Sequence, residues 1–192
     1  MNNENNLNEI SKVSYAGIYL GLSIILVFIQ IPIPTPWGGI AIDLGLVPVI
    51  IARRHIGDQY AIIIAFIYPW FTLAGYIGGA IPGVLALILL SLMFVASDYL
   101  FAKITRNYNN SPKKYTFSWM CCWHFLAMLI ISFVLLIFNL FLFWPMYLDG
   151  WMPSFDNYYL IVFIITIVTT TIRYIAVYLL ISFIYPKIYH YL

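Results

Sequence analysis

Long apolar runs alternate with short polar or glycine- and proline-rich stretches along nearly the whole chain. Each run predicts a membrane-spanning helix, and together they cover residues near 13–30, 43–52, 59–75, 81–102, 119–145 and 158–186. The second and third runs are short, because a span needs about 20 mainly apolar residues. We expect an all-α integral membrane protein with six transmembrane helices in a single membrane domain covering 1–192, in which 1–11 is a cytosolic tail.

The stretches at 31–39 and 75–83 separate these runs with prolines and glycines, which do not continue a helix. Unpaired backbone groups are not tolerated in lipid, so such stretches belong outside the hydrocarbon or over a protein-lined cavity. We expect irregular loops there.

Basic residues lie on one side of the predicted membrane topology. Eight of the nine Lys and Arg residues lie at the start of the first run, in the second and fourth loops, or after the last run: Lys12, Arg53, Arg54, Lys103, Arg106, Lys113, Lys114 and Lys187. Because cytosolic loops carry the excess of Lys and Arg, both termini are predicted to be cytosolic.

Composition supports the membrane assignment and limits the chemistry. The 192 residues are 64% apolar and only 8% charged, which leaves no room for a separate soluble catalytic domain. The sequence has no phosphate-binding loop, nucleophile elbow or metal-binding His-Glu-x-x-His pattern. We expect no enzyme activity, no cofactor, no metal and no nucleic-acid partner.

Arg173 is the remaining basic residue, and it lies inside the last apolar run. A cation at mid-helix costs about 2.5–3.5 kcal/mol on insertion scales, so it should face the interior of the bundle and a polar partner. It is the leading candidate for ligand binding. The alternative is a structural arginine that pairs with a neighbouring helix or extends to the interface.

Asn139 lies in an aromatic segment near the outer end of the fifth run, where an amide needs either another helix or a polar ligand as partner. Aromatic residues gather on the same outer side: Trp37, Tyr68, Trp70, Trp144, Tyr147 and Trp151. They form either an interfacial belt or a stacking surface for a planar ligand.

Three further polar residues have open roles. Asp43 either caps the second helix or lines a site, and Asp98 is predicted to be interfacial, paired with Lys103 or solvated. His124 has no second ligand residue at metal-binding spacing. A membrane-embedded enzyme acting on lipid would need these three residues to meet, although topology places Asp43 on the opposite side. A structural membrane protein without a ligand is a further alternative.

Three segments resemble the substrate-binding S components of energy-coupling factor (ECF) vitamin transporters. Residues 17–23, Gly-Ile-Tyr-Leu-Gly-Leu-Ser, are similar to the small-residue face of the family's first helix, and Ile42-Asp-Leu-Gly-Leu-Val-Pro48 is similar to the start of its second. Asn139 with Pro145 and Tyr147 resembles the series of the riboflavin-specific members.

This resemblance implies a vitamin-uptake subunit of a bacterial cell membrane. Asn139 and Arg173 would contact riboflavin, with outer loops covering the pocket, and Gly17 and Gly21 would dock a transmembrane coupling subunit that works with two cytosolic ATPases. The chain departs from the riboflavin pattern in having Arg173 where those members have lysine, and no acid along 61–67. Folate, thiamine, pyridoxine and niacin therefore stay as alternative ligands.

Overall fold

The computed structural model describes residues 8–35, 38–75, 81–108, 117–143, 146 and 158–189. Its elements, in chain order, are α1 (Glu9–Val27), β1 (Gln30–Thr35), β2 (Gly38–Asp43), α2 (Leu46–Ile56), α3 (Asp58–Ile67), the 3-10 turn η1 (Tyr68–Phe71), α4 (Thr72–Gly75), α5 (Ile81–Tyr108), α6 (Phe117–Phe138), the π-helical segment η2 (Asn139–Phe143) and α8 (Tyr158–Tyr189). Each predicted apolar run overlaps a helix of the described chain, although the runs 13–30 and 43–52 also reach into the strands at Gln30 and Asp43. The runs beginning at 81 and 158 match the starts of α5 and α8.

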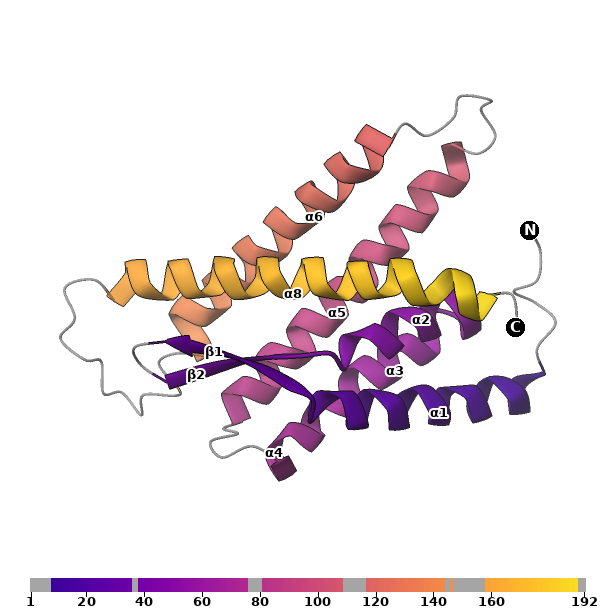
Figure 1. Ribbon diagram of the computed structural model, residues 1–192, viewed down its shortest axis with the longest axis horizontal. Helices are drawn as coiled ribbons and strands as arrows, with labels where there is room; N and C mark the ends of the chain where they lie inside the picture. The colour runs from indigo at the N-terminus through magenta and orange to yellow at the C-terminus, as the bar shows by residue number, and fades with distance from the viewer. Residues whose placement is uncertain are drawn as a thin grey trace.

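Figure 1 shows how the helices are arranged. α1, α2 and α3 pack together, α5 lies beside α3 and α2, and α6 packs on α5 and α8. The beginning of α1 and the end of α8 lie at the same end of the molecule, and the β1–β2 hairpin lies toward the other end (Figure 1). We call these the inner and the outer end, after the predicted topology.

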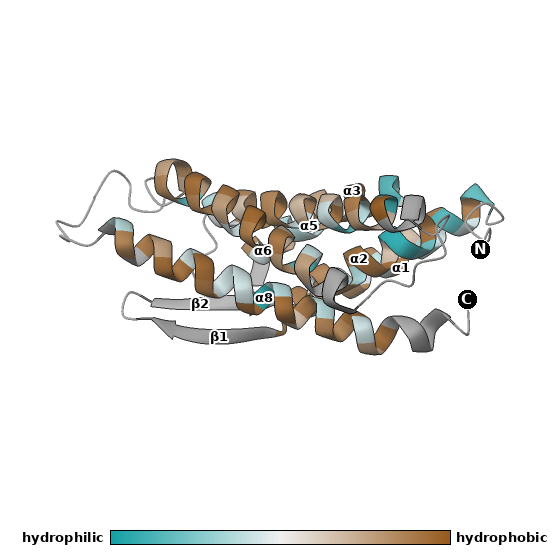
Figure 2. Ribbon diagram, turned by 90° about the horizontal axis from the view of Figure 1, so that it is seen from above, coloured by the Kyte–Doolittle hydropathy of each residue, from teal (hydrophilic) through white to brown (hydrophobic). Residues whose placement is uncertain are grey.

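Four helices of the described chain are long and apolar enough to cross a membrane, within Glu9–Val27, Ile81–Ile104, Cys122–Phe143 and Val162–Ile184. Their outward faces carry exposed side chains such as Phe125, Phe133 and Phe183, and Figure 2 shows apolar residues along most of α5, α6 and α8. The chain is thus a multi-pass membrane protein. α2, with 11 residues, and α3, with 10, are shorter than a full span, so the count of six crossings stays a prediction.

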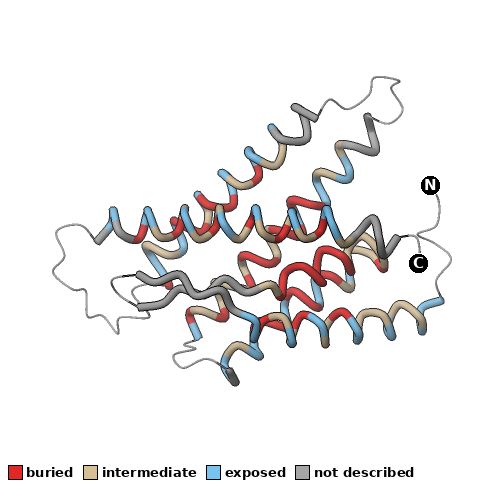
Figure 3. Tube along the Cα trace, viewed as in Figure 1, coloured by how far each residue is buried: buried red, intermediate tan, exposed pale blue. Residues whose placement is uncertain are grey.

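α2 lies at the centre of the core. Eight of its 11 residues are buried, and it contacts α1, α3, α5 and α8. Residues 46–52 of α2 are apolar on all sides, which is expected of a helical stretch surrounded by protein. Figure 3 shows the buried residues concentrated where α2, α3 and α5 meet.

The expectation of an irregular loop after the first helix is wrong for Gln30–Thr35 and Gly38–Asp43. β1 and β2 form an antiparallel hairpin in which Gln30 pairs with Asp43 and Thr35 with Gly38. A hairpin of two strands leaves one edge of each unpaired, so a strand can hold prolines whose missing N–H groups point away from its partner. Pro32 and Pro34 are two residues apart and therefore face the same edge of β1.

Candidate functional site

A polar contact joins the π-helical segment η2, which follows α6, to α8. The Asn139 amide Nδ2 donates a hydrogen bond to Thr166 Oγ1 at 2.9 Å, and Thr166 is only 2% exposed. Leu136, one turn before Asn139, and Val162, one turn before Thr166, form a small buried apolar cluster. An amide in such surroundings needs a partner, and Thr166 supplies it.

Asn139 is also the first residue of the π-helical segment η2. π-helical turns are rare and occur frequently at functional sites, because the wider turn changes the direction of the side chains that follow it. η2 contacts both α5 and α8, and its last residue, Phe143, is 2% exposed. The segment therefore lies between the helices that would enclose an outer pocket.

Arg173 lies on the same face of α8 as Thr166. The residues are seven positions apart, which is about two turns or 10 Å along the helix. Thr170 lies between them on this face and is 4% exposed. Thr166, Thr170 and Arg173 thus form a polar stripe on α8 that begins at the Asn139 contact and runs toward the inner end.

The structure gives Tyr68 a place in the packed core. Its side chain is 0% exposed, and its hydroxyl shares a hydrogen bond of 2.8 Å with Ser91 on α5. Its ring lies against Gly45, where an added Cβ would come within 2.8 Å of it. Contact between Tyr68 and a ligand stays a prediction.

The remaining predicted outer residues are described only in part. Trp37, Trp144, Tyr147 and Trp151 lie outside the described residues. Asp43 is the last residue of β2 and pairs with Gln30 through the backbone, and its side chain is not among those described.

Gly17 and Gly21 lie on an open face of α1. A Cβ added at either glycine would meet nothing within 4 Å. Tyr19, Ser23 and Val27 form the buried face of the same helix. The glycines leave a smooth strip on the outward side, where another helix can approach closely.

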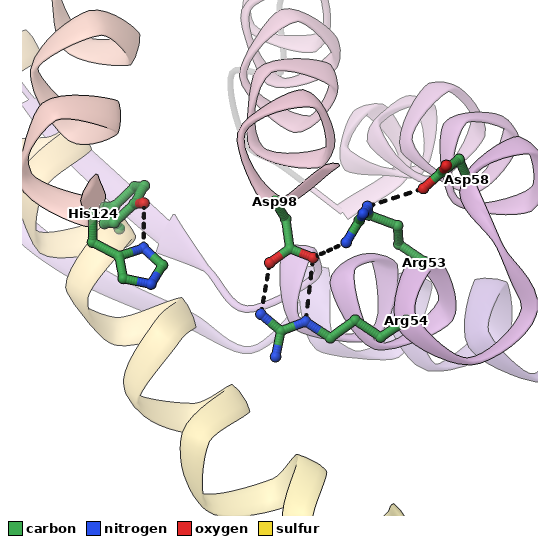
Figure 4. A network of polar contacts seen from close by, with 6 residues as sticks. Arg53, Arg54, Asp58, Asp98 and His124 are labelled. Carbon is green, nitrogen blue, oxygen red and sulfur yellow. Dashed lines mark hydrogen bonds and ion pairs between the residues drawn. The ribbon is translucent and has the colours of Figure 1, made fainter. Parts of the chain in front are cut away.

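A network of charged residues occupies the inner end, as Figure 4 shows. Arg54 binds Asp98 through two nitrogens, Nη2 to Oδ1 at 2.6 Å and Nε to Oδ2 at 3.2 Å. Arg53 also binds Asp98, and its Nε lies 3.0 Å from Asp58 Oδ1. We call these four residues the Asp98 cluster.

The cluster corrects the prediction for Asp98. Its side chain is 1% exposed instead of interfacial, and its described ion pairs are with Arg53 and Arg54 instead of Lys103. The physical reason is that Arg53 and Arg54 belong to the last turn of α2, which packs on α5, and not to a loop as the sequence predicts. Both arginines therefore reach Asp98 on α5.

Histidines at this end also have partners. His124 Nδ1 shares a hydrogen bond of 2.9 Å with the Tyr174 hydroxyl, and His55 Nδ1 shares one of 2.9 Å with the Tyr19 hydroxyl. Asp98 and His124 are thus held by different partners, which does not favour a shared catalytic role. The described residues contain no group of three His, Cys, Asp or Glu side chains that would hold a metal ion.

Comparison with known proteins decides the fold. No protein-family model and no curated protein matches the sequence. A solved structure described as the S component of a bacterial ECF transporter superposes with a TM-score of 0.70 at 19% sequence identity, over 96% of this chain and 98% of that one. The chain has the S-component fold.

Within the S-component fold, sequence reasoning missed Thr166 and the partners of Asp98. Thr166 was detectable, because it stands seven residues before Arg173 with Thr170 between them, the spacing of one helix face. The pairing of Asp98 was not detectable, since Asp98 is more than 40 positions from Arg53 and Arg54 and only the packing of α2 on α5 brings them together.

Proposed function

We propose that this protein is the substrate-binding S component of an ECF-type vitamin importer in a bacterial cell membrane. The observation that carries the proposal is the likeness to a solved S component over nearly the full length of both chains. An unrelated membrane protein with a similar helix count would not be expected to match over 96% of the chain. The open glycine strip and the polar contact between η2 and α8 support it independently.

The ligand would bind toward the outer end, between α5, α6, α8 and the outer loops. Asn139, Thr166 and Arg173 supply an amide, a hydroxyl and a guanidinium along one side of this region. These groups suit a planar ligand with several hydrogen-bond acceptors, because a guanidinium only donates and an amide and a hydroxyl do both. Riboflavin is the first candidate, and folate, thiamine, pyridoxine and niacin are the alternatives.

The partner side would be the open face of α1. Gly17 and Gly21 would let a helix of a transmembrane coupling subunit pack closely there, and two cytosolic ATPases would complete the importer. ATP hydrolysis would belong to those ATPases, so the purified chain alone should show none.

The test is a vitamin titration of the protein purified in detergent. Tryptophan fluorescence and visible absorption are recorded as riboflavin is added, and the other vitamins follow by calorimetry. A nanomolar dissociation constant corresponds to about 12 kcal/mol of binding free energy, which a buried ring with several polar contacts can provide.

Matched variants locate the site. Asn139→Ala and Arg173→Ala should each raise the dissociation constant at least tenfold, whereas Lys103→Gln at the inner end should leave it unchanged. Binding of another vitamin with the same sensitivity would keep the S-component function and change the ligand. If the folded protein bound none of these vitamins, the proposal would be wrong.

A further inference from the structure

The Asp98 cluster joins helices that lie far apart in the chain. Asp98 is on α5, and the two arginines that hold it are adjacent residues in the last turn of α2. Arg53 also reaches Asp58, at the start of α3. Figure 4 shows the carboxylate of Asp98 between the two guanidinium groups.

Such a cluster costs free energy to bury, because each ion loses its hydration. Well-packed apolar residues often hold helices together as strongly as a buried ion pair does. What an ion pair adds is geometry: two parallel bonds from a planar guanidinium to a carboxylate fix the orientation of both groups. The Asp98 cluster therefore sets one defined alignment of α2 on α5.

Through α2, the Asp98 cluster is connected to the face of α1 that is proposed to dock a partner. α2 packs on α1, and His55, next to Arg54, shares a hydrogen bond of 2.9 Å with Tyr19 of α1. His55 also packs against Tyr15, with ring centroids 4.8 Å apart. The outward side of α1 carries Gly17 and Gly21.

Through α5, the Asp98 cluster is connected to the helices that are proposed to bind the ligand. α5 packs on α6 and on η2, which begins with Asn139. The Asp98 cluster is thus a polar connection, toward the inner end, between α1–α2–α3 and α5–α6–α8, which we call the two units; packing of α3 on α5 and of α2 on α8 also joins them.

We propose that Asp98 is a positioning residue for transport: by holding Arg53 and Arg54 it aligns the α1–α2–α3 unit with the α5–α6–α8 unit, so that movement of the docked face carries the ligand site with it. This proposal rests on the proposed function. Removing the alignment should slow translocation of bound vitamin and leave vitamin binding itself nearly unchanged.

The first test separates these two effects by the kinetics of riboflavin uptake in cells that also produce a coupling subunit and two ATPases. Arg54→Gln is the mild variant, because its side chain is 25% exposed, and Asp98→Asn is the severe one. Arg54→Gln should lower the maximal uptake rate at least fivefold while KM and the vitamin dissociation constant of the purified protein stay within threefold. Lys103→Gln is the matched control and should change none of these quantities more than twofold.

A loss of uptake explained entirely by weaker vitamin binding, or wild-type uptake by a folded Arg54→Gln protein, would overturn the proposal. Asp98→Glu keeps the charge and should recover part of the rate that Asp98→Asn loses. A merely stabilising role predicts instead that the uptake of all variants follows the amount of folded protein.

The second test needs no ligand and no partner. Spin labels at exposed positions of α1 and α5, introduced as Ser14→Cys and Leu100→Cys with Cys121 and Cys122 replaced by serine, report the distance between the two units. Labelled protein with the intact cluster should give one narrow distance distribution, and Arg54→Gln should broaden or shift it. An unchanged distribution would contradict the alignment by Asp98 even if vitamin binding is confirmed. A vitamin titration without binding would overturn the proposed function, and with it the role in transport, while a changed distribution would still show the alignment.

Discussion

The two ends of the helical bundle use their polar residues differently. At the inner end, both oxygens of Asp98 are occupied by arginine nitrogens, and the carboxylate is 1% exposed. At the outer end, the bond from Asn139 to Thr166 uses one of the two amide hydrogens. A group that is saturated by its own protein holds helices in place, whereas a group used in part keeps capacity for a ligand.

Among the substitutions that test this comparison, Asp98→Asn is expected to lower the free energy of unfolding most. The substitution keeps the volume of the side chain but leaves two guanidinium groups around a neutral amide. Breaking a buried ion pair on one side costs about 3–5 kcal/mol, so the free energy of unfolding should fall by that order. Denaturation of the purified protein in mixed detergent measures it.

Lys103→Gln is the control for that variant, since Lys103 is an exposed cation on the same helix and lies near the Tyr99 ring, at 5.9 Å. Its effect on unfolding should be below about 0.5 kcal/mol, the usual range for surface substitutions. Equal stabilities of Asp98→Asn and Lys103→Gln would show that the inner cluster does not hold the helices.

The helices could be predicted from the sequence because lipid imposes long apolar runs, and the runs have visible ends. Two features could not be predicted in this way. The β1–β2 hairpin forms in a stretch where Pro32 and Pro34 argue against regular structure, and only the pairing with β2 makes their positions on one edge of β1 favourable. The burial of Asp98 depends on contacts between residues more than 40 positions apart, which no local pattern reports.

The outer ligand site stays a prediction. Asn139 and Arg173 were selected because single polar residues in apolar helices are costly, and the contact of Asn139 with a neighbouring helix is confirmed. Which ligand groups they contact stays a prediction. The role of Tyr68 shows the limit of the argument from aromatic density, since a ring counted toward an outer surface is fully buried.

Gly45→Ala should cause the next largest loss of stability. An added Cβ would lie 2.8 Å from the Tyr68 ring and 3.0 Å from the backbone oxygen of Ser23, so the core would have to shift. Overpacking of this kind costs about 1–3 kcal/mol. Gly21→Ala is the matched control, because its Cβ would meet nothing within 4 Å. If both variants unfolded at the same temperature, the close packing of α1, α2 and Tyr68 would be in doubt.

A smaller effect is expected from Thr166→Val at the outer end. The substitution keeps the shape of the side chain and removes the acceptor of the Asn139 amide. Hydrogen bonds between membrane helices average about 0.6 kcal/mol, so the stability should fall by an amount of this order. A loss as large as that of Asp98→Asn would mean that the outer contact, like the inner one, serves mainly to hold helices together.

The smallest expected effect is a dependence of stability on pH. It arises from His55 at the inner end, which lies beyond the predicted apolar run 43–52. Burial lowers the pKa of His55 below its ordinary value of 6.5, so the folded protein favours the neutral ring that shares a hydrogen bond with Tyr19. The unfolded chain then takes up a proton at higher pH than the folded one, and the stability contributed by neutral His55 is present above pH 6.5 and declines as the pH falls toward the lowered pKa. Unfolding measured between pH 7.5 and 5 should show this decline, and His55→Gln should reduce the slope without changing the stability order of the other variants. If the slope of stability against pH were the same in His55→Gln and in the unsubstituted protein, the pH dependence would belong to other groups. The contact between α1 and α2 would then be independent of the His55 charge.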